Sequence, residues 1–271
     1  MNSGCAKRVS VVLPTPITPY AKAGTPFADV SAWERSVAAL PAEQQVDAVV
    51  ARLKQLNPGF DGAVVPTFRN DVVTRLEFRT IHLTDLSPVR SLTRLETLEF
   101  IGSNTGKRSL ADLSPLTGMN LSGLNVCYSQ VADLSPLKGM RLEMLNIAAT
   151  RVSDLSALRD MKVTRLYCNN TQVDDLSPLA DIMLEALDIS RTPVSDLSPL
   201  MGTELHWLKC ANMPAVCDLA PLRDLPLGML WCDFKAERDA DVLRSIKTLQ
   251  MINDKPVAEF WKEVDAQAKV R

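Results

Sequence analysis

An aspartate returns repeatedly in nearly the same phrase along this chain of 271 residues. The phrase is Asp-Leu-Ser-Pro-Leu or a close variant, and it begins at Asp85, Asp112, Asp133, Asp154, Asp175, Asp196 and Asp218. A row of carboxylates could bind calcium, but one Ca²⁺ takes about six to eight oxygen ligands, and each copy offers a single acid beside apolar leucine and proline. The structural alternative is that an Asp or Ser oxygen accepts from a free backbone amide at the start of a short helical turn, where proline needs no N–H. We therefore expect these aspartates to shape turns, and we expect no metal and no cofactor.

Cysteine and histidine are the other residues that could do chemistry. The 6 cysteines contain no CxxC pair, so neither a zinc site nor a disulfide framework is supported. Those expected to point inward, because valine or isoleucine holds the same position elsewhere in the chain, are Cys168, Cys210 and Cys232. Cys127 is expected to face outward, but a thiol nucleophile needs a nearby base, and the only histidines, His82 and His206, lie far along the chain from it. The sequence therefore predicts a protein that is not an enzyme.

Charge and hydropathy limit the class of partner. The chain has 30 basic and 32 acidic residues and a net charge of −2, which gives no electrostatic footprint for nucleic acid and no polybasic membrane signal. No window approaches the roughly 18 apolar residues of a membrane-spanning helix, and the start MNSGCAKRVSVVLPTP has too short an apolar run for a secretory signal. We expect no nucleic-acid or membrane partner and a cytoplasmic location.

The aspartates mark an internal repeat. Their successive spacings are 27, 21, 21, 21, 21 and 22 residues, and apolar residues follow each aspartate from Asp112 onward by nine, twelve and fourteen positions in an LxxLxL pattern. A step of two is strand alternation, whereas helical repeats need about 33 residues or more. The period therefore predicts an α/β fold, a leucine-rich-repeat solenoid of about eight short parallel strands joined by 3₁₀ or turn segments, in which each repeat buries its leucines against its neighbours.

The two ends of the chain differ from the repeat. Residues 1–28 contain four prolines among small residues, which predicts a disordered tail or linker. Residues 29–62 show two helical patterns and are expected to form an N-terminal helical cap on a solenoid of residues 63–250. Residues 251–271 place Val257, Phe260 and Trp261 at helical spacing, so we expect a C-terminal helical cap over the last repeat.

These motifs also carry a family resemblance. LxxLxL followed by Thr or Ser, with DLSPL between strands, resembles bacterial leucine-rich repeats of the internalin type. The segments AEQQVDAVVARLKQLNPGFDG and INDKPVAEFWKE resemble leucine-rich-repeat regions common in planctomycete proteins, some of which are attached to serine/threonine kinases. No Gly-rich loop, HRD-like or DFG-like motif is present, so kinase activity is not implied. The first copy is irregular, because residues 101–111, IGSNTGKRSLA, insert a segment expected to protrude as a loop.

Positions that flank the strand leucines should face outward on the concave sheet. Their middle is small and neutral, whereas the C-terminal half carries aromatic and charged residues typical of binding hot spots. We expect partner contacts at Arg165, Tyr167, Asn169, Asp188, Trp207, Lys209, Trp231 and Asp233. The alternative is that a terminal cap covers Trp231, or that the aromatic residues only stack along the sheet. The predicted function is non-catalytic binding of a protein or peptide by a monomer; docking to a separately encoded kinase and structural self-association are the rivals.

Overall fold

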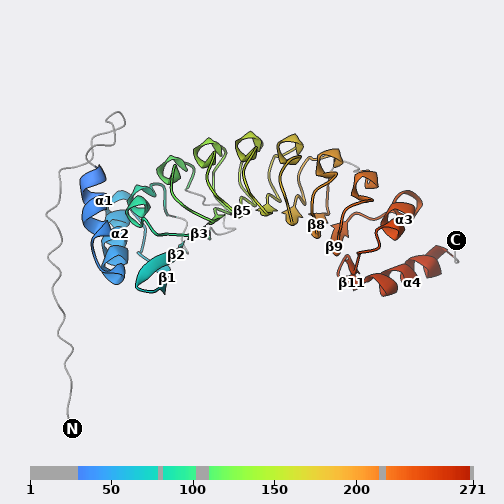
Figure 1. Cartoon of the computed structure of the whole chain (residues 1–271), viewed down its shortest axis with the longest axis horizontal. Helices are drawn as coiled ribbons and strands as arrows, with labels where there is room; N and C mark the ends of the chain where they lie inside the picture. Colours follow the sequence, from blue (N-terminus) through green and yellow to red (C-terminus); the bar gives the residue numbers. More distant parts are fainter. Residues whose placement is uncertain (1–29, 79–81, 102–109, 214–217, 269–271) are drawn as a thin grey trace, which may run out of the picture.

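The computed structural model describes residues 30–78, 82–101, 110–213 and 218–268, which form a curved arch (Figure 1). The tail expected over residues 1–28 and most of the loop expected over residues 101–111 lie outside the described residues. None of the described helices is long and apolar enough to cross a membrane.

One sheet runs along the inner side of the arch, with its strands in chain order. The strands are β1 (Val64–Arg69), β2 (Val72–Phe78), β3 (Thr97–Phe100), β4 (Gly123–Asn125), β5 (Met144–Asn146), β6 (Arg165–Tyr167), β7 (Ala186–Asp188), β8 (Trp207–Cys210), β9 (Met229–Cys232), β10 (Met251–Ile252) and β11 (Lys255–Pro256). Neighbours from β2 to β10 are parallel, and equivalent repeat positions pair with one another. The predicted solenoid of short parallel strands is therefore confirmed.

Short 3₁₀ helices on the outer side of the arch begin at the serine or alanine of each repeated phrase (Figure 1). They are η1 (Ser87–Ser91), η2 (Ser114–Leu116), η3 (Ser135–Leu137), η4 (Ser156–Leu158), η5 (Ser177–Leu179), η6 (Ser198–Leu200) and η7 (Ala220–Leu222). In a representative copy, Asp154 Oδ1 accepts from the Ser156 amide at 2.7 Å, and the Ser156 hydroxyl donates to Asp154 Oδ2 at 2.8 Å.

These two hydrogen bonds favour the charged carboxylate and lower the pKa of Asp154. The same pair of bonds lowers the pKa of Asp133, Asp175 and Asp196. The aspartates thus shape the turns on the side away from the inner sheet, as the structural interpretation predicts. Among the described residues, no three acidic, Cys or His side chains gather as a metal site would require.

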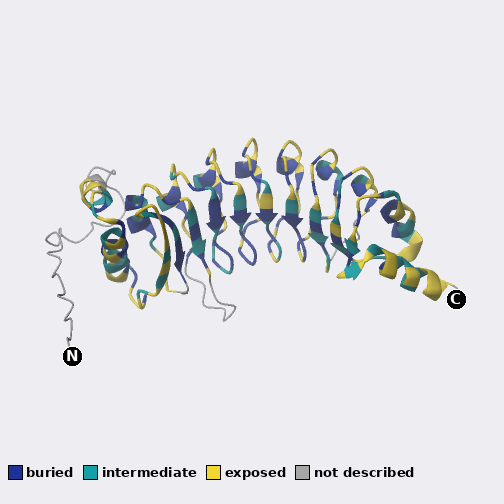
Figure 2. Cartoon of the chain, turned by 60° about the horizontal axis from the view of Figure 1, so that its bottom comes forward, coloured by how far each residue is buried: buried dark blue, intermediate teal, exposed yellow. Residues whose placement is uncertain are grey.

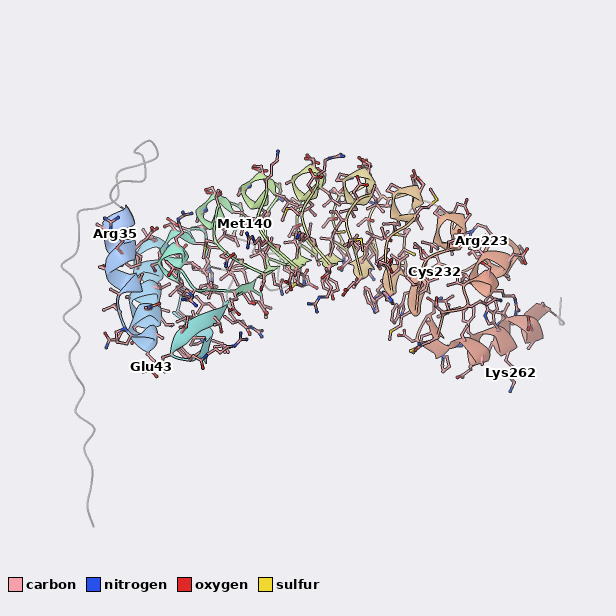
Figure 3. The ribbon with its side chains drawn as sticks, in the orientation of Figure 1. Arg35, Glu43, Met140, Arg223, Cys232 and Lys262 are labelled. Atoms are coloured by element: carbon pink, nitrogen blue, oxygen red, sulfur yellow. The ribbon has the colours of Figure 1, made fainter. Side chains whose placement is uncertain are left out.

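The buried apolar residues of the strands and the 3₁₀ segments form one continuous core, and Figure 2 shows buried residues recurring along the arch. Each central strand contributes one fully buried leucine: Leu124, Leu145, Leu166, Leu187, Leu208 and Leu230. Full burial of such a side chain stabilises the fold by about 1.5–3 kcal/mol, so the stacked leucines make a large favourable contribution to the free energy of folding. The structure confirms that Cys168, Cys210 and Cys232 are buried, and Figure 3 labels Cys232 near the C-terminal end of the sheet.

The outward exposure expected for Cys127 is wrong, because this residue is only 8% exposed. It follows β4, where Asn125 Oδ1 accepts from the Cys127 amide and closes a tight turn. Burial is the main cause that raises the pKa of its thiol. Cys127 is therefore a packed residue and a poor nucleophile.

The N-terminal cap contains α1 (Val30–Ala38) and α2 (Ala42–Leu56), and it is joined to the first repeat by a buried asparagine. Asn57 Oδ1 accepts from the Thr84 and Asp85 amides at 2.7 and 2.8 Å, while Nδ2 donates to the Leu53 and Asp85 carbonyls. One side chain thus satisfies backbone groups at the end of α2 and at the start of the first repeated phrase, which fixes the cap on the solenoid.

The C-terminal end contains α3 (Ala236–Ser245) and α4 (Val257–Ala268), and Figure 3 labels Lys262 at this end and Arg35 and Glu43 at the other. Asp239 lies in α3, where an α-helix takes the place of the 3₁₀ segment, and its Oδ2 accepts from the Lys235 amide at 2.8 Å. The last, degenerate copy of the repeat therefore keeps a capping aspartate on a longer helix.

The repeat predicts about eight strands, which correspond to β2 to β9. The sheet is extended by β1 at one end and by β10 and β11 at the other, so that each end of the sheet is an antiparallel hairpin. β1 and β2 are antiparallel around Asn70 and Asp71, with φ of 50° and 56°, and β10 and β11 are antiparallel around Asn253 and Asp254, with φ of 49° and 64°. Two successive left-handed residues are the signature of a type I′ turn, which asparagine and aspartate tolerate. The Asn-Asp pairs are visible in the sequence, but the hairpins were not predicted from it because they do not belong to the repeat.

Candidate binding surface on the concave face

The parallel register places the expected contact residues in two rows across β6 to β9. One row pairs Arg165 with Ala186, Ala186 with Trp207, and Trp207 with Met229. The second row pairs Tyr167 with Asp188, Asp188 with Lys209, and Lys209 with Trp231. The C-terminal concave patch is defined by these rows and the positions that follow them: Arg165, Tyr167, Asn169, Asp188, Trp207, Lys209, Trp231 and Asp233.

Three aromatic rings of the patch form one continuous cluster. The ring centroid of Trp207 lies 6.1 Å from that of Tyr167, with a 69° angle between the ring planes. It lies 5.3 Å from the centroid of Trp231, with a 47° angle. Tyr167 and Trp207 are on strands two apart, a separation of about 9–10 Å, so their rings lean toward each other across β7. The small side chain of Ala186 on β7, directly beside Trp207, leaves room for this contact.

The C-terminal hairpin contacts the outer edge of this cluster. The Trp231 Nε1–H donates to Asp254 Oδ1 at 2.9 Å, from the turn between β10 and β11. The sequence left open whether a terminal cap covers Trp231 or the aromatic residues only stack along the sheet. The structure has elements of both, because the terminal hairpin contacts Trp231 and the three rings pack against one another along the sheet. Tyr167, Trp207 and Trp231 are nevertheless only half-buried, so the cluster still presents apolar surface to solvent.

Two aspartates of the patch accept hydrogen bonds from backbone amides of the protein itself. Asp188 is only 8% exposed, and its Oδ1 accepts from the Ser190 amide at 2.9 Å. Asp233 is exposed, but its two oxygens accept from the Asn212 and Met213 amides at 3.0 and 2.9 Å. Asp188 therefore does not face solvent as expected, and both carboxylates stabilise the chain after a strand.

The hydrogen bond that Asp188 makes with the amide two residues later recurs at the equivalent position of earlier repeats. Asn125 and Asn146 each accept from the amide two residues later, at 3.0 Å. Asn and Asp side chains commonly close such turns, so a recurring Asn or Asp at this position is a sequence signal for a structural role. In contrast, Met229, which the sequence analysis did not single out, is 38% exposed beside Trp207 and enlarges the apolar surface.

The residues considered for thiol chemistry are not brought together. Cys127 follows β4 and His206 precedes β8, so four strand spacings, about 19 Å, separate them. His206 is exposed, and its Nδ1 lies 2.6 Å from the Glu204 carbonyl oxygen. This arrangement does not form a nucleophile and base pair.

Parallel strands, 3₁₀ return segments and a 21-residue period define the molecule as a leucine-rich-repeat solenoid. Among solved structures, the chain is similar to the internalin InlF of Listeria monocytogenes, with 24% identity, a TM-score of 0.50, and coverage of 62% of this chain and 57% of that chain. It is also similar to internalin C2 of the same organism, with 18% identity, a TM-score of 0.50, and coverage of 79% and 97%. These similarities establish an internalin-like leucine-rich-repeat fold.

The match spans little more than half the length of InlF. No protein-family model and no curated protein matches the chain. The closer resemblance to planctomycete and kinase-linked repeats therefore stays a prediction from the sequence.

Proposed function

We propose that the protein is a non-catalytic scaffold that binds a protein or peptide through the C-terminal concave patch. The observation that carries the proposal is the contiguous, half-exposed cluster of Tyr167, Trp207 and Trp231 on rigid parallel strands. Large aromatic side chains dominate the binding energy of protein interfaces when they are held in place near the centre of the contact.

The mechanism is preorganisation. Each strand of the patch is hydrogen-bonded to a neighbour on both sides, from β6 between β5 and β7 to β9 between β8 and β10. The aromatic rings are also braced by one another and by Asp254. Because these side chains are already ordered, little conformational entropy is lost when a partner covers them.

The test is affinity capture of partner proteins from a cell lysate, with the full chain as bait. It compares the native protein with the Trp207→Ala and Met201→Ala variants. Met201 is 60% exposed at the end of η6 on the outer side of the arch, so it is a matched apolar control away from the patch. We expect Trp207→Ala to lose the captured partner and Met201→Ala to retain it, with both variants keeping the native circular dichroism spectrum. Equal capture by all three proteins would contradict the proposal.

Two further expectations, on the oligomeric state and the location, belong with this proposal. Kinase docking and self-association are the rival functions. We expect a monomer, and sedimentation at several concentrations distinguishes it from a self-associated assembly. We also propose a cytoplasmic location, because the described cysteines are free thiols, which persist in reducing compartments.

A further inference from the structure

The cationic side chains of the concave face fall into two groups. Arg75, near the N-terminal end, is paired with Glu99 at 2.9 Å and with Glu77 at 3.4 Å. Arg165 is exposed and Lys209 is half-buried, and neither makes an ion pair or a side-chain hydrogen bond with any residue that the structure describes. Among the described residues of this face, the positive charges without an ion pair therefore lie in the C-terminal concave patch.

The nearby acidic groups have internal hydrogen-bond partners. Asp188 accepts from a backbone amide and is buried, Asp233 accepts from two backbone amides, and Asp254 accepts from the Trp231 indole. None of these carboxylates forms an ion pair with Arg165 or Lys209 in the described part of the chain, although Asp188 is the strand neighbour of Lys209. Their internal hydrogen bonds reduce the number of acceptors that the patch offers to a partner.

Several hydrogen-bond donors of the patch have no partner among the described residues. Like Arg165 and Lys209, the Trp207 indole N–H and the Tyr167 hydroxyl make no hydrogen bond to a described residue. The backbone of β7 is paired with β6 on one side and β8 on the other, so a partner cannot add a strand here. Recognition here therefore uses side chains, and the unpartnered donors and half-exposed rings favour a partner that supplies acceptors and apolar surface.

Building on the function proposed above, we propose that the occupant is an extended acidic peptide segment that carries a large apolar side chain. Its carboxylates pair with Arg165 and Lys209, and its apolar side chain covers Trp207 and Tyr167. The two cationic residues are two strands and one row apart, about 12 Å between Cα atoms. An extended peptide advances about 3.3 Å per residue and alternates its side chains between two faces, so acidic residues four positions apart, about 13 Å, lie on one face and match this spacing.

The experiment is selection of a displayed library of random 12-residue peptides on the full-length protein. We expect the selected peptides to be net negative and to contain at least one large apolar residue. A synthetic copy of a selected peptide should bind about tenfold or more weakly to the Arg165→Glu, Lys209→Glu double variant, because two attractive charges become repulsive. Its affinity should also fall when NaCl is raised from about 0.05 to 0.5 M.

Two controls separate the possible outcomes. The variant Lys138→Glu, Arg159→Glu reverses two exposed cations on the outer side of the arch and should change affinity by no more than about twofold. Selected peptides that are neutral, proline-rich or basic, yet lose binding to Trp207→Ala, would overturn the acidic partner and leave the proposed function intact. If no selected peptide depends on Trp207, both the inference and the proposed function are wrong.

Discussion

Leu166→Ala tests the claim that stacked leucines hold the binding strands in place. Leu166 lies on β6 between Arg165 and Tyr167, is 0% exposed, and pairs in register with Leu145 and Leu187. The substitution removes three carbon groups, a loss of about 2.4 kcal/mol at roughly 0.8 kcal/mol each. The cavity left in a rigid stack raises the expected loss of unfolding free energy to about 3–5 kcal/mol.

The assay combines urea unfolding, followed by circular dichroism, with hydrogen exchange. Because each repeat touches mainly its neighbours, exchange should accelerate most in β5, β6 and β7 and least in the distant strands β2 and β10. Met183→Ala is the control, since this side chain is 64% exposed in the following repeat and its removal should change stability by less than about 0.5 kcal/mol. A loss below about 1 kcal/mol for Leu166→Ala, or acceleration spread evenly over the chain, would refute this account of the core.

Three other predictions follow from single contacts. Ala186→Leu should lift Trp207 from Tyr167, changing the near-ultraviolet circular dichroism and weakening partner binding while Ala186→Gly does neither; unchanged spectra in the leucine variant would contradict the contact across β7. Asn57→Ala should cost about 2–4 kcal/mol, because amides at the cap junction lose their acceptor, with faster hydrogen exchange in α2; exchange at the native rate would exclude this role. Because hydrogen bonds lower the pKa of the turn aspartates in the folded state, their stabilisation is present above the unfolded pKa of about 3.9 and is lost as pH falls through the folded values. The melting temperature should therefore fall below about pH 4, and replacing Asp133, Asp154, Asp175 and Asp196 by asparagine should flatten that fall; equal acid sensitivity in the variant would contradict the assignment.

Much of the architecture can be predicted from the repeat because its signal is local. The 21-residue spacing from Asp133 to Asp154 returns every strand to the same register, so the inward leucines and the outer turns follow from counting. The end hairpins occur once each and therefore give no periodic signal. Their type I′ turns depend on Asn70–Asp71 and Asn253–Asp254, pairs that are common in many loops.

The candidate site was predictable only in part. Counting placed Tyr167, Trp207 and Trp231 on the concave face, and the structure brings their rings together. Counting also placed Asp188 outward, but a side chain at that position can turn back to its own backbone, and Asp188 does so. A strand period specifies the face of the sheet on which a side chain begins and leaves open which group it then contacts.

The sequence by itself determined the period, the parallel strands, the turn aspartates and the row of residues on the inner face, because each depends on the spacing of neighbours along the chain. Only the tertiary structure decided which charges on that face lack an internal partner and which rings touch. Trp207 contacts Tyr167, forty residues earlier, across the small side chain of Ala186 on the strand between them. Trp231 is held by a hydrogen bond to Asp254, which lies in the turn of the C-terminal hairpin. Such contacts depend on the sizes and directions of side chains from different repeats, which a pattern within one repeat does not contain.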